Sequence, residues 1–88
     1  MEYLKVKVLD ETGTDIDVLI NGEKNGKIEE VLTLSEGWVT ISVNIKADKI
    51  ELYDVTQGHP GKDINDGSIE LCNTTPTKPM IIEAQING

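Results

Sequence analysis

The sequence has no phenylalanine and no arginine, and it contains only one cysteine, one tryptophan and one histidine. A single cysteine, Cys72, excludes an internal disulfide and a metal cluster built on cysteine. The strand-like run Ile69-Glu70-Leu71-Cys72 predicts that Cys72 is a small apolar filler, because a reactive thiol needs basic neighbours and the only histidine is His59. Without phenylalanine, the core must be built from valine, isoleucine and leucine.

Positive charge is also scarce. Sixteen acidic residues against eight lysines give a formal charge of −8, which opposes binding to nucleic acid or to an anionic membrane. The same excess permits a basic partner or a cation. No secretory signal and no apolar run of about 18 residues is found, so neither a signal peptide nor a membrane span is expected, and no feature assigns a compartment. The 88 residues suit one domain, 1–88.

Period-two alternation of apolar and polar residues dominates the chain, and clusters of glycine, asparagine and aspartate interrupt it. Residues 10–14 are a turn by composition, and Asn21-Gly22 or Asn25-Gly26 supplies the positive-φ residues of a hairpin. The expected inward sets at the two ends are Leu4, Val6 and Val8; Ile16, Val18 and Ile20; and Met80, Ile82, Ala84 and Ile86.

Two hairpins are predicted in the middle of the chain, with tips at Glu36-Gly37 and Ala47-Asp48. Both registers place the same large aliphatics on one face, with Glu30 as the single exception. The inward residues on the shared strand are therefore Val39, Ile41, Val43 and Ile45. The predicted cross-strand pairs are Leu34 with Val39, Leu32 with Ile41, Ile28 with Ile45, Ile45 with Ile50, and Val43 with Leu52.

The remaining segments are an irregular stretch at 56–67, a short strand at 68–73, an extended linker at 74–79 and a last strand at 80–87. Seven strands of this kind predict an all-β fold, a small immunoglobulin-like antiparallel sandwich without the antibody disulfide. A partly open β-barrel is the alternative.

Two segments resemble a known family. The run Val18 to Lys27 is similar to the opening of PEGA-type domains, in which an apolar strand enters an Asn-Gly turn and a second glycine follows. The run Leu34 to Val43 resembles their next hairpin, and carboxypeptidase-regulatory-like sandwiches look much the same. The likeness covers about a third of the chain and departs at Ile28-Glu29, where the family pattern has Thr-Pro. It implies a non-enzymatic β-sandwich that accompanies larger surface or envelope proteins.

No catalytic motif is present. His59 lies in the turn sequence Gly58-His59-Pro60-Gly61, where a nucleophile and an orienting group are hard to recruit. There is no phosphate loop and no paired-histidine metal motif. We therefore expect no enzymatic activity and no cofactor.

Two acidic clusters are candidate calcium sites, since calcium prefers several oxygen ligands. The first contains Asp63, Asn65 and Asp66, followed by Gly67. The second contains Asp10, Asp15 and Asp17. The first departs from the helix-loop-helix calcium pattern, because its glycine comes one residue early and no helices flank it. We favour an Asx-type turn that caps local backbone groups, and weak calcium binding is the alternative.

A third candidate is a sheet face. The predicted registers place Trp38, Thr40 and Ser42 outward on one strand with Tyr53 opposite, a combination that suits a peptide or a sugar. The alternative is a solvated face with a tryptophan at the end of the core. Sheet edges are a further option, with Lys5 and Lys7, and prolines before the last strand, as protective features.

These features favour a non-catalytic module that acts through protein–protein contact, by self-association or with another protein, or as a structural part of a larger assembly. The alternative is a small-ligand binder for carbohydrate or weakly bound calcium. An enzyme is the least favoured class.

Overall fold

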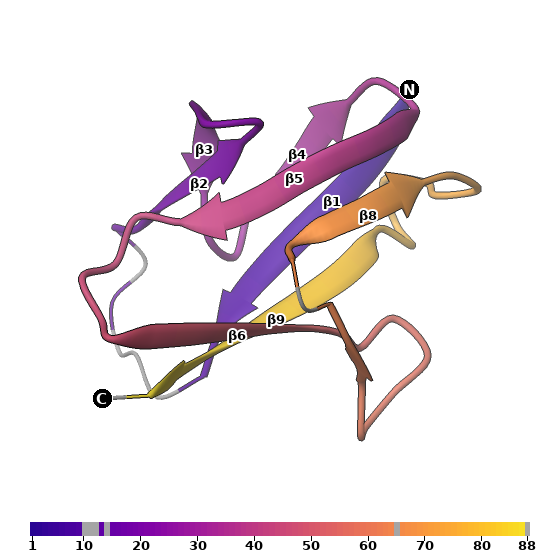
Figure 1. Ribbon diagram of the computed structural model, residues 1–88. Helices are drawn as coiled ribbons and strands as arrows, with labels where there is room; N and C mark the ends of the chain where they lie inside the picture. The colour runs from indigo at the N-terminus through magenta and orange to yellow at the C-terminus, as the bar shows by residue number, and fades with distance from the viewer. Residues whose placement is uncertain (10–12, 14, 65, 88) are drawn as a thin grey trace.

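The computed structural model describes residues 1–9, 13, 15–64 and 66–87. This part of the chain is all-β and forms two sheets packed as a sandwich (Figure 1). It contains no helix, and hence none that spans a bilayer. The strands are β1 (Glu2–Val8), β2 (Asp17–Ile20), β3 (Glu23–Lys27), β4 (Val31–Leu34), β5 (Gly37–Val43), β6 (Lys49–Asp54), β7 (Lys62–Asp63), β8 (Ser68–Leu71) and β9 (Met80–Asn87).

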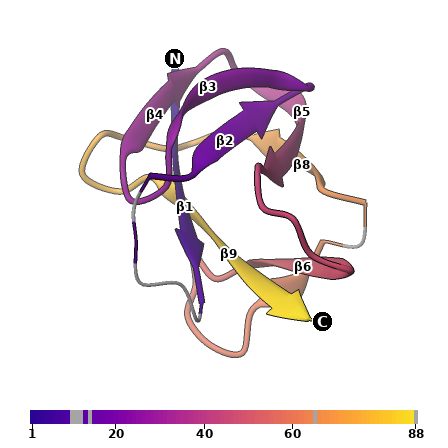
Figure 2. The ribbon, with the colours of Figure 1, turned by 90° about the vertical axis from the view of Figure 1, so that its left-hand side faces the viewer.

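The first sheet has the order β4-β1-β9-β6-β7, and the second has the order β3-β2-β5-β8. Viewed from the side in Figure 2, β4, β1 and β9 lie on one side of the core, and β5 and β8 lie on the other. The first and last strands, β1 and β9, pair in parallel. The sequence predicted an antiparallel sandwich, and the parallel pairing of β1 with β9 corrects that prediction. The nine described strands exceed the expected seven because β3 and the two-residue β7 are additional.

The two predicted central hairpins are wrong. Strand β4 pairs with β1 in the first sheet, whereas β5 pairs with β2 and β8 in the second. Strand β6 pairs with β9 and β7, so it is not a neighbour of β5. Both connections pass from one sheet to the other. Leu34 and Val39 are therefore not partners in one sheet, and neither are Val43 and Leu52, because the two members of each pair lie in opposite sheets.

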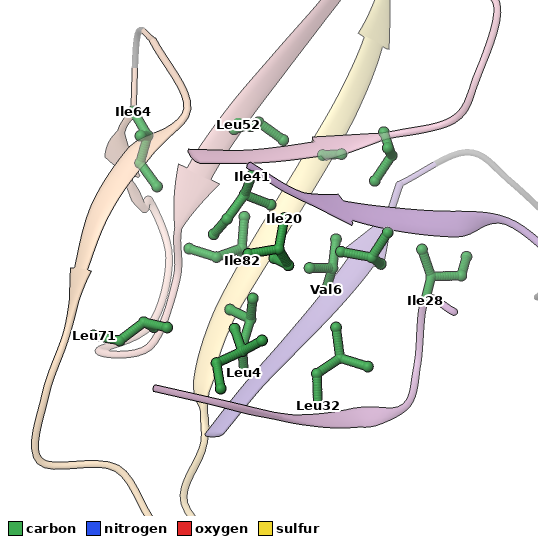
Figure 3. Packing of buried hydrophobic residues seen from close by; sticks show 14 residues of the cluster. Leu4, Val6, Ile20, Ile28, Leu32, Ile41, Leu52, Ile64, Leu71 and Ile82 are labelled. Atoms are coloured by element: carbon green, nitrogen blue, oxygen red, sulfur yellow. The ribbon is translucent and has the colours of Figure 1, made fainter. Parts of the chain in front are cut away.

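The predicted inward residues are nevertheless confirmed, except for Ile86, which is only partly buried and is not part of the core cluster. Side chains from both sheets meet in one core (Figure 3), in which Ile41 is 2% exposed and Val43 6%. Val39 and Ile45 are partly buried against it. The buried cluster consists of Leu4, Val6, Val18, Ile20, Ile28, Leu32, Leu34, Ile41, Val43, Leu52, Ile64, Leu71, Ile82 and Ala84.

Of the two candidate hairpin turns, Asn21-Gly22 is the one used. Both residues have positive φ, 53° and 85°, which suits a two-residue turn whose twist matches the strands. Asn25-Gly26 instead lies within β3, where the register shifts by one residue. The predicted turn at 10–14 falls mostly outside the described residues.

The exception at Glu30 also has an explanation. Residues 28–30 are not part of a strand, because β4 begins at Val31. Glu29 has a positive φ of 67°, and Glu30 Oε1 accepts a hydrogen bond from the Lys27 N–H at 2.8 Å. Glu30 therefore closes a turn at the surface and does not face the core.

A buried carboxylate ties the start of the chain to the segment before β9. Glu2 is 8% exposed, and its Oε1 accepts hydrogen bonds from the Thr74 N–H at 2.9 Å and the Thr74 hydroxyl at 2.7 Å. The Tyr3 N–H in turn donates to the Thr74 hydroxyl at 2.7 Å. These bonds hold the pKa of the Glu2 carboxyl below its ordinary value, chiefly through the Thr74 backbone. The predicted extended linker includes a turn, closed by a bridge between Thr75 and Lys78.

Candidate interaction surface

The outer face of β5 carries the most exposed aromatic side chain among the described residues. Trp38 is 71% exposed, and Thr40 and Ser42 follow it outward along the strand. Alternation explains this placement, since Val39 and Ile41 point inward. The sequence prediction for Trp38, Thr40 and Ser42 is consistent with this arrangement.

Neighbouring strands extend this face on both sides of β5. Glu70 of β8 lies opposite Trp38, and Ser68 lies opposite Thr40, with their hydroxyl oxygens 3.3 Å apart. On the other side, Leu19 of β2 lies opposite Ser42. The Thr40 N–H donates to the Asn21 side-chain oxygen at 2.9 Å, which fixes the end of the β2–β3 turn against β5. The face is polar except at Leu19 and Trp38.

Trp38 forms a ridge between two surface hollows. One, of about 500 Å³, lies beside β8 and includes Ile69, Glu70 and Met80 in its lining. The other, of about 420 Å³, lies toward the β2–β3 turn, with Asn21 among its lining residues. An aromatic ridge flanked by concave surface offers a partner apolar contact and shape complementarity together.

Tyr53 does not belong to this face. It lies on β6, in the other sheet, and pairs with Glu83 and Asp63 rather than with Ser42. Its hydroxyl donates to Glu51 Oε2, which raises the pKa of Tyr53. The prediction that Tyr53 faces Ser42 is wrong, because it depended on the β5–β6 hairpin.

The described residues contain no group of three or more carboxylate, cysteine or histidine side chains that could hold a metal. Asp66 Oδ1 accepts the Ser68 N–H at 3.0 Å, as expected for an Asx turn. Asp63 lies on β7, and Asn65 is outside the described residues.

The second acidic cluster is occupied by lysine. Lys27 Nζ lies 2.8 Å from a carboxylate oxygen of Asp15 and 2.8 Å from one of Asp17. These contacts raise the pKa of Lys27 and lower that of Asp17. Asp10, the third predicted member, is outside the described residues.

His59 lies on an exposed loop, with its Nε2 3.1 Å from Glu83 Oε2. This pair borders a hollow of about 480 Å³ over the outer face of β6 and β9, together with Tyr53 and Pro60. The hollow's lining residues include no serine, threonine or cysteine to act as a nucleophile beside the histidine.

Cys72 is exposed, so its predicted role as a buried filler is wrong. The reason is alternation after β8. Leu71 is fully buried and Glu70 is exposed, which turns the next residue outward.

Lys5 and Lys7 do not protect an edge, because β1 lies between β4 and β9. The prolines at 76 and 79 precede β9, which is also an interior strand. In the described part of the chain, the edge strands are β4, β7, β3 and β8. Sequence reasoning missed the open edge of β8 and the hollow beside it, because both depend on which strands are neighbours.

No protein-family model, no curated protein and no solved structure matches this chain.

Proposed function

We propose that this domain is a non-catalytic module that binds another protein through the outer face of β5, with Trp38 as the anchor. One observation carries the proposal: Trp38 is 71% exposed at the crest between two hollows. Tryptophan is enriched among the residues that dominate binding energy, because it buries a large area at a small cost in conformational entropy. Elsewhere in the described chain, the large aliphatics are mostly buried.

The surroundings of Trp38 support contact with protein. Hydroxyl groups of Thr40, Ser42 and Ser68 and the carboxylate of Glu70 form a polar surround. A central apolar anchor with a polar rim is the usual anatomy of a protein interface. We also propose that the sandwich is immunoglobulin-like, and that its resemblance to PEGA-type domains reflects a related accessory role.

A peptide-display selection tests the proposal. Binders are enriched from a random peptide library on the wild-type domain and then measured against Trp38→Ala. The matched control is Val31→Ala, which removes an apolar side chain that is 45% exposed on the edge strand β4 of the other sheet. We expect most binders to weaken at least tenfold on Trp38→Ala, about 1.4 kcal/mol, and to be unaffected by Val31→Ala. Equal binding to both variants would overturn the proposal.

The Trp38→Ala variant must also remain folded for this test to be informative. Because the side chain is largely in solvent, we expect its removal to change the free energy of unfolding by no more than about 0.5 kcal/mol. Urea denaturation followed by far-ultraviolet circular dichroism measures this change. A loss of several kcal/mol would place Trp38 in the core and remove it as an anchor.

Carbohydrate is a second candidate ligand, favoured by one observation. The hydroxyl groups of Thr40 and Ser68 lie 3.3 Å apart on the same face as Trp38, so an aromatic platform and hydrogen-bonding groups are close together. A glycan array probed with wild type and Trp38→Ala separates the two candidates. A glycan signal that Trp38→Ala abolishes would favour this second function over peptide binding.

A further inference from the structure

Strand β8 leaves part of its backbone without a neighbouring strand. It is the last strand of its sheet and pairs only with β5 among the described strands. The Ile41 N–H donates to the Gly67 carbonyl at 2.9 Å, so the backbone of Gly67 faces β5. Because these directions alternate along a strand, Ile69 and Leu71 also face β5, whereas Ser68 and Glu70 direct their backbone groups toward the open side.

One of those open groups is already satisfied within the chain. The Ser68 N–H donates to Asp66 Oδ1 at 3.0 Å. No other described residue bonds to the carbonyl of Ser68 or to either backbone group of Glu70, so these three groups are directed toward the open side. An extended peptide placed alongside would pair with these groups, as in other complexes formed by strand addition.

The hollow of about 500 Å³ follows this edge and includes residues from both faces of β8. Trp38 and Glu70 border it on the outer side, and Ile69, Ile64 and Met80 border it on the inner side. Side chains of an added strand alternate between these two sides. Every second side chain would lie beside Glu70, and the others would cover the aliphatic side chains.

The charge around the hollow selects the chemistry of the outer side chains. Four carboxylates line it, against a single lysine, Lys62. They belong to Asp54, Asp63, Asp66 and Glu70. Two of the carboxylates already accept hydrogen bonds, Asp54 from Thr56 and Asp66 from Ser68. Glu70 is exposed and makes no ion pair with any described residue, so it is available to an external cation. A second copy of this acidic chain would bring like charges together at the same edge.

We propose that the open edge of β8 binds an extended peptide segment in which lysine alternates with aliphatic residues. The lysines lie beside Glu70, and the aliphatic side chains cover Ile69 and Met80. This inference rests on the proposed function as a protein-binding module and adds the class of partner and its mode of binding.

The test titrates isotope-labelled domain with a defined probe, the acetylated and amidated peptide Lys-Val-Lys-Val-Lys-Val-Lys, and follows backbone amide signals by NMR. We expect the largest shifts at 66–71 and at Trp38. The control peptide Lys-Lys-Lys-Lys-Val-Val-Val has the same composition without alternation, and we expect it to bind at least fivefold more weakly. Equal binding of the two peptides, or shifts centred on β3 or β4, would overturn the inference.

N-methylation separates strand pairing from simple charge attraction. In one probe, the lysine amides are methylated, and in the other, the valine amides. Only one of these sets can face β8 in an added strand, so one probe should lose binding and the other should keep it. If both probes bind as well as the unmodified peptide, pairing with the backbone is excluded.

Charge reversal at Glu70 tests the outer contact. Glu70→Lys should weaken the alternating lysine peptide by about fivefold or more and should favour its glutamate counterpart. The matched control is Asp48→Lys, an exposed residue between β5 and β6 that lies away from both hollows, which makes the same change in net charge. Equal weakening by the two variants would attribute the effect to overall charge and would contradict the specific contact.

Failure of this inference is distinguishable from failure of the proposed function. If no lysine-valine peptide binds but displayed peptides still require Trp38, the module binds protein by its face and not by the β8 edge. If the alternating peptide binds wild type and Trp38→Ala equally at the β8 edge, the edge inference stands and Trp38 is not the anchor.

Discussion

Two adjacent residues in the middle of β5 should respond very differently to truncation. Ile41 is 2% exposed in the core, whereas Ser42 points outward beside Leu19. Replacing isoleucine with alanine removes three carbon atoms, worth about 2.4 kcal/mol at about 0.8 kcal/mol for each buried methylene. The cavity left behind adds to this loss, so we expect Ile41→Ala to cost about 3–4 kcal/mol. Ser42→Ala should stay within about 0.5 kcal/mol.

The loss expected for Ile41→Ala is a large part of the domain's total free energy of unfolding. At about 0.05–0.15 kcal/mol per residue, a domain of this length has a total stability of about 4–13 kcal/mol. The melting temperature of Ile41→Ala should fall by about 12 °C or more, at about 4–8 °C for each kcal/mol in a domain of this size.

The assay is urea denaturation followed by far-ultraviolet circular dichroism. Fluorescence is a poor reporter here, because the only tryptophan is already largely in solvent when the domain is folded. The Ser42→Ala variant is the matched control, since it changes the neighbouring residue on the same strand. If both variants lose comparable stability, or if Ile41→Ala loses less than about 1 kcal/mol, the assignment of the two faces of β5 is refuted.

Two further predictions concern individual contacts. Because Thr74 holds the pKa of Glu2 below its ordinary value of 4.5, this carboxylate stabilises the fold above that pH, and its contribution is lost as the pH falls through the lowered value. In thermal melts, Glu2→Gln should therefore be less stable than wild type at pH 7, and this difference should shrink as the pH falls through the lowered pKa of Glu2. The control Glu23→Gln should follow wild type throughout. Gly67 has a φ of +75°, and an added Cβ would lie 2.7 Å from the Ile41 carbonyl oxygen, so Gly67→Ala should cost about 1–3 kcal/mol in denaturation. A Gly67→Ala variant as stable as wild type would show that the segment between β7 and β8, which passes from one sheet to the other, is not tightly packed.

The inward residues were predictable because burial follows the alternation of the strand itself. Ile41 and Val43 face the core whether the next strand is a hydrogen-bonded neighbour or lies in the opposite sheet. The partner strands were not predictable, because the alternation of a strand is the same whichever strand lies beside it. The short connection at Ser35-Glu36 suits a hairpin and a crossing between sheets equally well, and only Glu30 broke the predicted pattern.

The candidate surface was predictable to the same extent. Trp38, Thr40 and Ser42 need only the alternation of β5, and the structure places them outward together. Tyr53 needed the identity of the neighbouring strand, which the pattern does not contain. The hydrogen bond between Glu2 and Thr74 joins residues 72 positions apart, and no local sequence pattern predicts such a contact.

The open edge of β8 was still less predictable from the sequence. The pattern of Ser68 to Leu71 predicts a short strand whether that strand lies inside a sheet or at its edge, and its place at the edge follows from the strand order of the second sheet. The acidic residues around the hollow come from separate segments, with Asp54 at the end of β6 and Glu70 on β8. Only the packing of the two sheets brings these acidic residues to the same hollow.

The placement of β5 between β2 and β8 decides whether the Trp38 face and the β8 edge exist, and a nuclear Overhauser measurement between α-protons tests it. Trp38 and Glu70 are partners in a pair without direct backbone hydrogen bonds, the arrangement that brings opposite Cα atoms closest. We predict a strong cross-peak between their α-protons. Cross-peaks between β4 and β5 in its place, such as Leu34 with Val39, would contradict the two-sheet assignment and the surface derived from it.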